Sequence, residues 1–175
     1  MFEAYATPEF ADEYFDAAGN AAWPVTPPEE SPEREVVLKK KSAALFRATM
    51  WIDGIGRGKW KGTKTSADQP LAWPRQGVTD EEGFSVDADS IPELLAQAVC
   101  EAAVREITGT SLAPDMERGG AIKQEVIGPI STTFMDNAPA GTRFPVIENL
   151  LSGLVKQPLF DTGKPVSGSV KIARA

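Results

Sequence analysis

The sequence predicts a mainly α fold, in which a small helical bundle is followed by an extended, β-containing C-terminal arm. Three segments repeat apolar residues at helical spacing, and each begins with residues typical of helix starts. After residues 119–120, a Gly-Gly pair, the spacing changes to the alternation typical of strands. The length of 175 residues and the hydrophobic content of 42% suit one domain with a modest core. We therefore expect a helical body over residues 1–118 and an arm (strand, short helix and tail) over residues 119–175.

The first helix is expected to begin at Thr7, with Pro8 at its first position and Glu9 in its first turn. Apolar residues from Phe10 to Ala18 then fall on one face, and the following Gly-Asn pair ends the helix.

The second helix is expected to run from residues 31–33, a Ser-Pro-Glu start signal, to Ile52. Leu38, Leu45 and Ile52 recur at a spacing of seven residues. The basic residues 39–41 interrupt this pattern. They are better explained as a solvated helix face than as a phosphate contact.

A loop over residues 54–90 connects this helix to the next one. Its glycine-rich start, residues 54–62, follows a helix and not a strand, which excludes a phosphate-binding loop. What remains is a flexible basic loop with Trp60 at its tip. Two prolines then bracket Trp73 and precede Arg75, and they stiffen this stretch. The stretch either closes one end of the bundle as a plug or forms a rigid contact element, since Trp and Arg often anchor interfaces.

The third helix is expected to open at residues 91–93, Ile-Pro-Glu, and to end at Gly109. Its apolar side is rich in alanine, which permits close approach of neighbouring helices, so we expect it to be the central helix. Cys100 lies on this side and is expected to be a small core residue, not a nucleophile.

The arm begins with an alternating apolar pattern at Ile122, Val126, Ile130 and Phe134. A Gly-Pro pair at residues 128–129 interrupts it and favours a bulged or edge strand. Residues 144–151 predict a short helix that ends before Gly153, and residues 166–172 predict another strand. The two strand segments either pair with each other as a distorted hairpin or add to the sheet edge of another chain.

Composition argues against an enzyme. The chain has no His, which removes the commonest general base and the commonest metal ligand. The acidic residues between Asp80 and Asp89 do not have the spacing of a calcium loop, so we expect no metal, cofactor or catalytic site. The net charge of −7 opposes general nucleic-acid binding.

The same sequence favours a cytoplasmic protein. A single Cys excludes an internal disulfide and suits a reducing compartment. The first four residues lack the basic region of a secretory signal, and no apolar run reaches the length of a transmembrane helix.

Taken in order, several stretches resemble the head–tail connector (neck adaptor) proteins of long-tailed bacteriophages, and more narrowly a phage family catalogued as DnaT-like single-stranded-DNA-binding proteins. Two stretches lie in the early helix and in the loop: Ala-Asp-Glu-Tyr-Phe at residues 11–15, followed by a Trp, and Trp-Lys-Gly at 60–62 with Gln-Pro-Leu-Ala-Trp-Pro-Arg at 69–75. The others are the Ile-Pro helix start at 91–92, Val-Ile-Gly-Pro-Ile at 126–130, and Phe-Pro at 144–145 followed by Leu-Leu at 150–151. They cover most of residues 5–155. The chain departs from this pattern in a longer first loop at residues 24–32 and in a tail beyond Gln157.

This resemblance implies a structural virion protein, made in the host cytoplasm, that forms a ring, commonly a dodecamer, beneath the portal. Its implied partners are the portal protein, further copies of itself and a tail-side neck or stopper protein, while DNA passes through the channel without specific binding. The positions implied to contact the portal or a neighbouring subunit are Ile122, Val126, Ile130, Phe134, Phe144, Leu150 and Leu151. The implied loop contacts are Trp60, Trp73 and Arg75.

The name of the catalogued family suggests an alternative, a replication accessory protein that binds single-stranded DNA. Such a protein needs cations beside exposed aromatic rings on which bases can stack. The candidate residues for this surface are Arg57, Lys59, Trp60, Lys61, Lys64 and Trp73.

Overall fold

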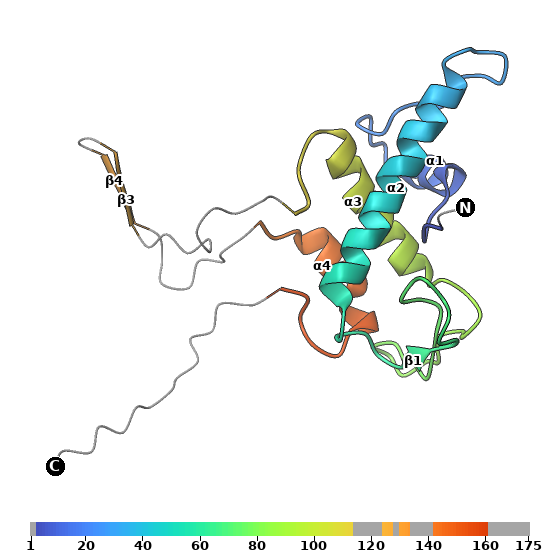
Figure 1. Cartoon of the computed structure of the whole chain (residues 1–175), viewed down its shortest axis with the longest axis vertical. Helices are drawn as coiled ribbons and strands as arrows, with labels where there is room; N and C mark the ends of the chain where they lie inside the picture. Colours follow the sequence, from blue (N-terminus) through green and yellow to red (C-terminus); the bar gives the residue numbers. More distant parts are fainter. Residues whose placement is uncertain (1–2, 114–123, 128–129, 134–141, 161–175) are drawn as a thin grey trace. The chain divides into compact units, whose positions relative to one another are not determined.

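The computed structural model describes residues 3–113, 124–127, 130–133 and 142–160, and these confirm the mainly α class. Four helices, α1 to α4, dominate the described part of the chain (Figure 1). The chain divides into two compact units. The first joins Met1–Pro114 to Phe144–Leu159, and the second joins Asp115–Arg143 to Phe160–Ala175.

Helix α1, Pro8–Ala17, begins as the sequence predicts. The Thr7 hydroxyl accepts a hydrogen bond from the Phe10 amide at 3.2 Å, and Pro8 occupies the first turn, where its missing N–H costs nothing. The helix buries Ala11 and Phe15. Gly19 follows with a φ of 63°, a left-handed conformation that suits glycine at a helix end.

Helices α2, Arg34–Gly56, and α3, Glu93–Ile107, form the centre of the first unit. In α2 the fully buried residues include Leu45 and Ile52, two of the three residues that recur every seven positions. Helix α3 packs against α1, α2 and α4, which confirms it as the central helix. Cys100 is buried within α3, and this burial raises the pKa of its thiol to about 12. It is therefore a core residue that stays protonated near neutral pH.

Helix α4, Pro145–Leu151, and the 3-10 helix η2, Ser152–Leu154, belong to the helical body. Ile147 and Leu151 are fully buried, and α4 packs against α3 (Figure 1). The expected boundary at residue 118 is therefore wrong for residues 144–159. The sequence predicted this helix correctly. It did not predict that the apolar side of α4 packs against α3 and forms part of the core.

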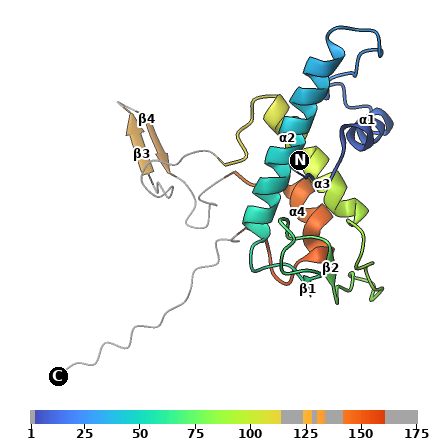
Figure 2. The same ribbon diagram turned by 45° about the vertical axis from the view of Figure 1, so that its right-hand side comes forward.

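Two short strands, β1 at Thr63–Lys64 and β2 at Arg75–Gln76, pair antiparallel within the loop that follows α2 (Figure 2). The loop is tied to the end of η2 by further backbone bonds. Lys61 donates its amide to the Leu154 carbonyl at 3.0 Å, and Lys156 donates to the Lys59 carbonyl at 2.7 Å. The chain after α4 therefore returns to the loop after α2.

In the second unit, β3 at Gln124–Ile127 pairs antiparallel with β4 at Ile130–Thr133. The ladder aligns Ile127 with Ile130 and Val126 with Ser131. The sequence predicted one interrupted strand here, and the structure has two strands around the Gly-Pro pair. Ile122, Phe134 and the strand expected at residues 166–172 lie outside the described residues.

No helix in the described part of the chain is long and apolar enough to cross a membrane.

Candidate functional site

The indoles of Trp60 and Trp73 pack against each other where the loop after α2 closes the end of the bundle. Their ring centroids are 5.8 Å apart in an edge-to-face arrangement, and only 3% and 1% of the two residues is exposed. Gly56 at the end of α2 makes room for this pair, since a Cβ there would lie 2.3 Å from the Trp60 ring. The plug interpretation of the loop is therefore correct for this subunit.

The cations of the same loop bond to backbone carbonyl groups of the chain itself. Arg75 donates from Nε to the Lys61 carbonyl at 2.7 Å and from Nη2 to the Gly62 carbonyl at 2.8 Å. Lys61 Nζ donates to the Gly153 carbonyl at 2.8 Å, and Lys59 Nζ donates to the carbonyl of Leu159. These groups fix the loop and the end of η2 to each other.

A half-buried carboxylate, that of Asp53, extends this cluster toward the N-terminus. Asp53 accepts from the Tyr5 hydroxyl at 2.5 Å and from the Ala72 amide at 2.8 Å, and the Trp73 amide donates to the Tyr5 oxygen at 3.1 Å. Burial raises the pKa of Asp53, although these hydrogen bonds oppose the increase. Burial and the adjacent carboxylate also raise the pKa of Tyr5. Among the described residues, neither indole N–H of the Trp60–Trp73 pair has an acceptor.

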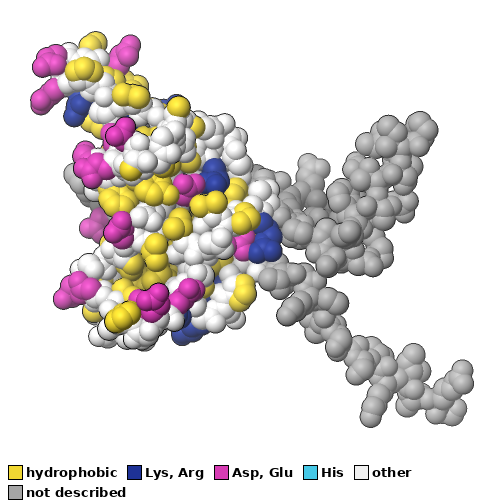
Figure 3. All heavy atoms as spheres, turned by 180° about the vertical axis from the view of Figure 1, so that it is seen from behind, with side chains coloured by type: hydrophobic (Ala, Val, Ile, Leu, Met, Phe, Trp, Pro, Cys, Tyr) yellow, Lys and Arg dark blue, Asp and Glu magenta, His cyan; other side chains and the backbone are white. Residues whose placement is uncertain are grey.

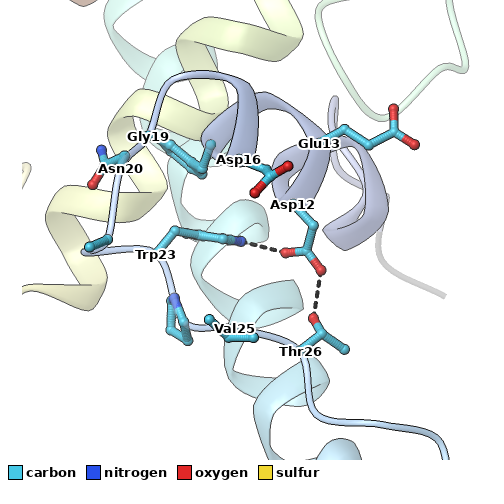
Figure 4. A pocket seen from close by; sticks show the side chains of 11 residues that line it. Asp12, Glu13, Asp16, Gly19, Asn20, Trp23, Val25 and Thr26 are labelled. Carbon is cyan, nitrogen blue, oxygen red and sulfur yellow. Dashed lines mark hydrogen bonds between the residues drawn. The ribbon is translucent and has the colours of Figure 1, made fainter.

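A second cluster lies in an open cleft of about 560 Å³ between α1 and the loop that follows it (Figure 4). Asp12 accepts from the Trp23 indole N–H at 2.6 Å and from the Thr26 hydroxyl at 2.5 Å, and it forms an ion pair with Lys41 of α2. Lys41 is fully buried, and its ammonium lies 5.4 Å from the centroid of the Trp23 ring.

The charges in this cluster stabilise each other. Partial burial alone would raise the pKa of Asp12, but hydrogen bonds from Lys41, Thr26 and Trp23 outweigh it, and the net shift is downward. The cleft itself is rimmed by Glu13 and Asp16, both exposed. The rim of the cleft therefore carries negative charge, while at its base the charge of Asp12 is neutralised by Lys41.

The residues expected to contact the portal or a neighbouring subunit divide into four groups. Phe144 and Leu151 are 5% and 0% exposed and pack within this chain, so they are core residues and not free contacts. Leu150 is half-buried. Val126 and Ile130 lie in the β3–β4 hairpin, and Ile122 and Phe134 are outside the described residues.

The loop contacts expected at Trp60, Trp73 and Arg75 are corrected in the same way. Both indoles are buried in their own subunit, and the Arg75 guanidinium is held by the chain's own carbonyl groups. Of the candidate DNA-binding residues, Arg57 and Lys64 remain exposed, but no exposed Trp stands beside them in the described part.

We did not predict from the sequence that Lys41 and Tyr5 are buried, or that Asp53 is half-buried and accepts a hydrogen bond from Tyr5. A signal for Lys41 was present, because it shares the α2 side of Leu45 and Ile52 and so faces the core. No such signal marks Asp53, whose partners are 19 and 48 residues away along the chain. Within the described residues, no group of three His, Cys, Asp or Glu side chains is placed to hold a metal ion.

Comparison with known proteins agrees with the narrower resemblance found in the sequence. No curated protein and no solved structure matches the chain. A family described as "Putative DnaT-like ssDNA binding protein" matches residues 1–175, the whole of the sequence, and the chain belongs to this family.

Proposed function

We propose that this protein is a structural subunit of the virion neck, a head–tail adaptor that forms a ring beneath the portal and joins capsid to tail. The subunits line the channel through which DNA leaves the capsid. The chain acts by assembly and not by catalysis. This proposal extends the resemblance to neck adaptors noted in the sequence.

The observation that carries the proposal is that the Trp and basic side chains of the loop after α2 make their contacts within the subunit. A single-strand-binding surface requires exposed aromatic faces beside free cations. Here Trp60 and Trp73 are 3% and 1% exposed, and Lys61 and Arg75 are bonded to backbone carbonyls. These groups therefore stabilise the fold of the subunit itself, as a structural role in a ring requires.

The acidic surface supports the same function. Asp and Glu side chains dominate the charged groups on the face shown in Figure 3, and the whole chain carries a net charge of −7. Like charge disfavours adhesion to phosphates, so DNA can slide past such a surface.

The test is assembly on the portal. Purified portal protein and this chain are mixed and separated by sedimentation, and the neck of assembled particles is imaged with the chain labelled. We expect co-sedimentation in a fixed ratio and label between capsid and tail. Absence of the label from the neck, together with no portal binding, would reject the adaptor function.

The alternative function is single-stranded-DNA binding in replication, and the description of the family favours it. Fluorescence anisotropy with labelled oligonucleotides at about 50 mM and about 200 mM salt separates the two, because phosphate contacts make affinity fall steeply with salt. Salt-sensitive binding at micromolar or lower concentration would support the DNA-binding function. The adaptor function predicts no such binding.

A further inference from the structure

The outer side of α2 carries a regular stripe of exposed apolar and basic residues. Residues three and four positions apart share one side of a helix. Val36, Lys40, Ala43, Arg47 and Met50 follow this spacing, and all five are exposed. Val36, in the first turn of α2, and Met50, further along it, are 69% and 50% exposed, which is unusual for large apolar side chains of a helix that packs in a bundle.

This stripe lies opposite the buried side of the same helix. Lys41, Leu45, Ala48 and Ile52 are fully buried and face α1 and α3. With 3.6 residues per turn, the stripe positions fall about half a turn away from these residues. Figures 1 and 2 show α2 in front of α3, with no described element covering its outer side.

The cleft beside α1 has the complementary character. Among its lining residues, Val25 is 87% exposed, and Glu13 and Asp16 are exposed carboxylates at the rim. Neither carboxylate has a cationic partner in the described part of the chain. Lys41 reaches the base of this cleft from the buried side of α2, so the cleft and the stripe are on opposite sides of that helix.

The charges along the sequence are segregated in the same way. The first 33 residues contain eight acidic residues and no basic one. From Val36 to Ile52, the α2 segment contains four basic residues and no acidic one. Lys41 is buried against Asp12 and Arg47 pairs with Glu106 of α3, so Lys39 and Lys40 are the two cations that this segment offers to a partner. A chain with opposite charges on opposite sides has the complementarity that a head-to-tail contact between identical subunits requires.

We infer that the α2 stripe of one copy binds the α1 cleft of a second copy, and that this heterologous contact joins subunits side by side. Lys40 of the stripe and the adjacent exposed residue Lys39 meet Glu13 and Asp16, while Val36 packs near Val25. The inference rests on the proposed function, since it names the surfaces by which the adaptor ring closes. The two surfaces of this contact differ, so each copy uses its stripe to bind one neighbour and its cleft to bind the other. Repetition of the contact gives a ring if the rotation closes and an open filament if it does not.

Charge reversal tests this contact. The stripe variant combines Lys39→Glu with Lys40→Glu, and the cleft variant combines Glu13→Lys with Asp16→Lys. All four residues are exposed, so each variant should keep the melting temperature of the wild type within a few degrees. Self-association is measured by sedimentation velocity over a wide concentration range at low salt.

We expect each variant alone to associate at least about tenfold more weakly than the wild type, because like charges then face each other. An equimolar mixture of the two variants should recover association, because the acidic stripe of one fits the basic cleft of the other. The quadruple variant, with both surfaces reversed in one chain, should also recover it. This recovery cannot arise from a mere loss of folding.

Three outcomes would overturn the inference: a wild type that stays monomeric at about 0.5 mM in low salt, variants that associate as the wild type does, or a mixture that does not recover. If the stripe variant loses oligonucleotide binding while self-association is unchanged, the stripe serves nucleic acid and the inference also fails. Portal binding of the wild type is measured separately. A wild type that binds the portal but does not self-associate rejects this contact and leaves the adaptor function standing.

Discussion

Lys41 places a charged ammonium group in the contact between α1 and α2. It stands last in a run of three lysines, yet it is fully buried, while Lys39 and Lys40 are exposed. Its ammonium is compensated by Asp12, by the Thr26 hydroxyl at 2.5 Å and by the face of the Trp23 ring. A buried ammonium needs such partners because its desolvation is costly.

Replacing Lys41 with Met should therefore destabilise the protein by about 2 to 3 kcal/mol, since it leaves the partly buried Asp12 without its cation. The measurement is urea unfolding followed by circular dichroism. Lys40→Met is the matched control on the exposed side, and it should change the free energy of unfolding by less than about 0.5 kcal/mol. Equal effects of the two substitutions would contradict the role assigned to Lys41.

The lowered pKa of Asp12 predicts a dependence of stability on pH. A carboxyl group whose pKa is lower in the folded protein contributes stability above its unfolded-state pKa of about 4, and this contribution disappears as the pH falls through the folded-state pKa. The wild type should therefore lose more stability than Asp12→Asn when acidified below about pH 4. Parallel unfolding curves for both proteins across that range would disprove the coupling.

At the scale of elements, the end of α2 and the helix α4 decide how the bundle closes. Gly56 lies against the Trp60 ring, and Leu151 is fully buried where α4 meets α3. The loop after α2, the indole pair and η2 are joined by backbone and lysine hydrogen bonds. The core of the helical body therefore depends on α4 and η2, which begin more than thirty residues after the end of α3.

Gly56→Ala should destabilise the protein by about 1 to 3 kcal/mol, because the added Cβ would lie 2.3 Å from Trp60 and must displace a buried ring. A thermal melt records this as a lower melting temperature. Gly54→Ala, in the same helix with nothing within 4 Å of the added Cβ, should be neutral or stabilising by up to about 1 kcal/mol. The opposite order of the two melting temperatures would refute the packing described here.

Leu151→Ala tests whether α4 is part of the core. The side chain is fully buried, so its truncation should cost about 2 to 5 kcal/mol in the free energy of unfolding. Val146→Ala, on the same helix but 48% exposed, should cost less than about 0.5 kcal/mol. If α4 instead bound only to another protein, both substitutions would leave the isolated chain unchanged.

At the scale of the whole molecule, charge is separated more strongly than a net value of −7 suggests. The acidic first 33 residues and the basic α2 segment give the helical body two sides that complement each other. If these sides meet between copies, self-association should weaken as salt screens the contact. Sedimentation at about 50 mM and about 500 mM salt measures this dependence, and association that strengthens with salt would indicate an apolar contact instead.

The sequence alone determined those features that depend on neighbouring residues. The Thr7 cap, the helix periods of α2 and α3, and the short helix at residues 145–151 follow from local spacing and capping, and all are present in the structure. The membership of the family also follows from the sequence. These properties are encoded within about one or two helical turns, where a pattern can be read directly.

Only the tertiary structure decided where α4 packs, that Trp60 and Trp73 are buried, and which of three adjacent lysines enters the core. These outcomes depend on partners distant in the chain: Lys61 bonds to Gly153, and Tyr5 to Asp53. Local spacing fixes which side of a helix is apolar, but not which segment will cover it. Long-range packing decides this. It buries Trp60 and Trp73, which were expected to contact another subunit, at the end of the bundle.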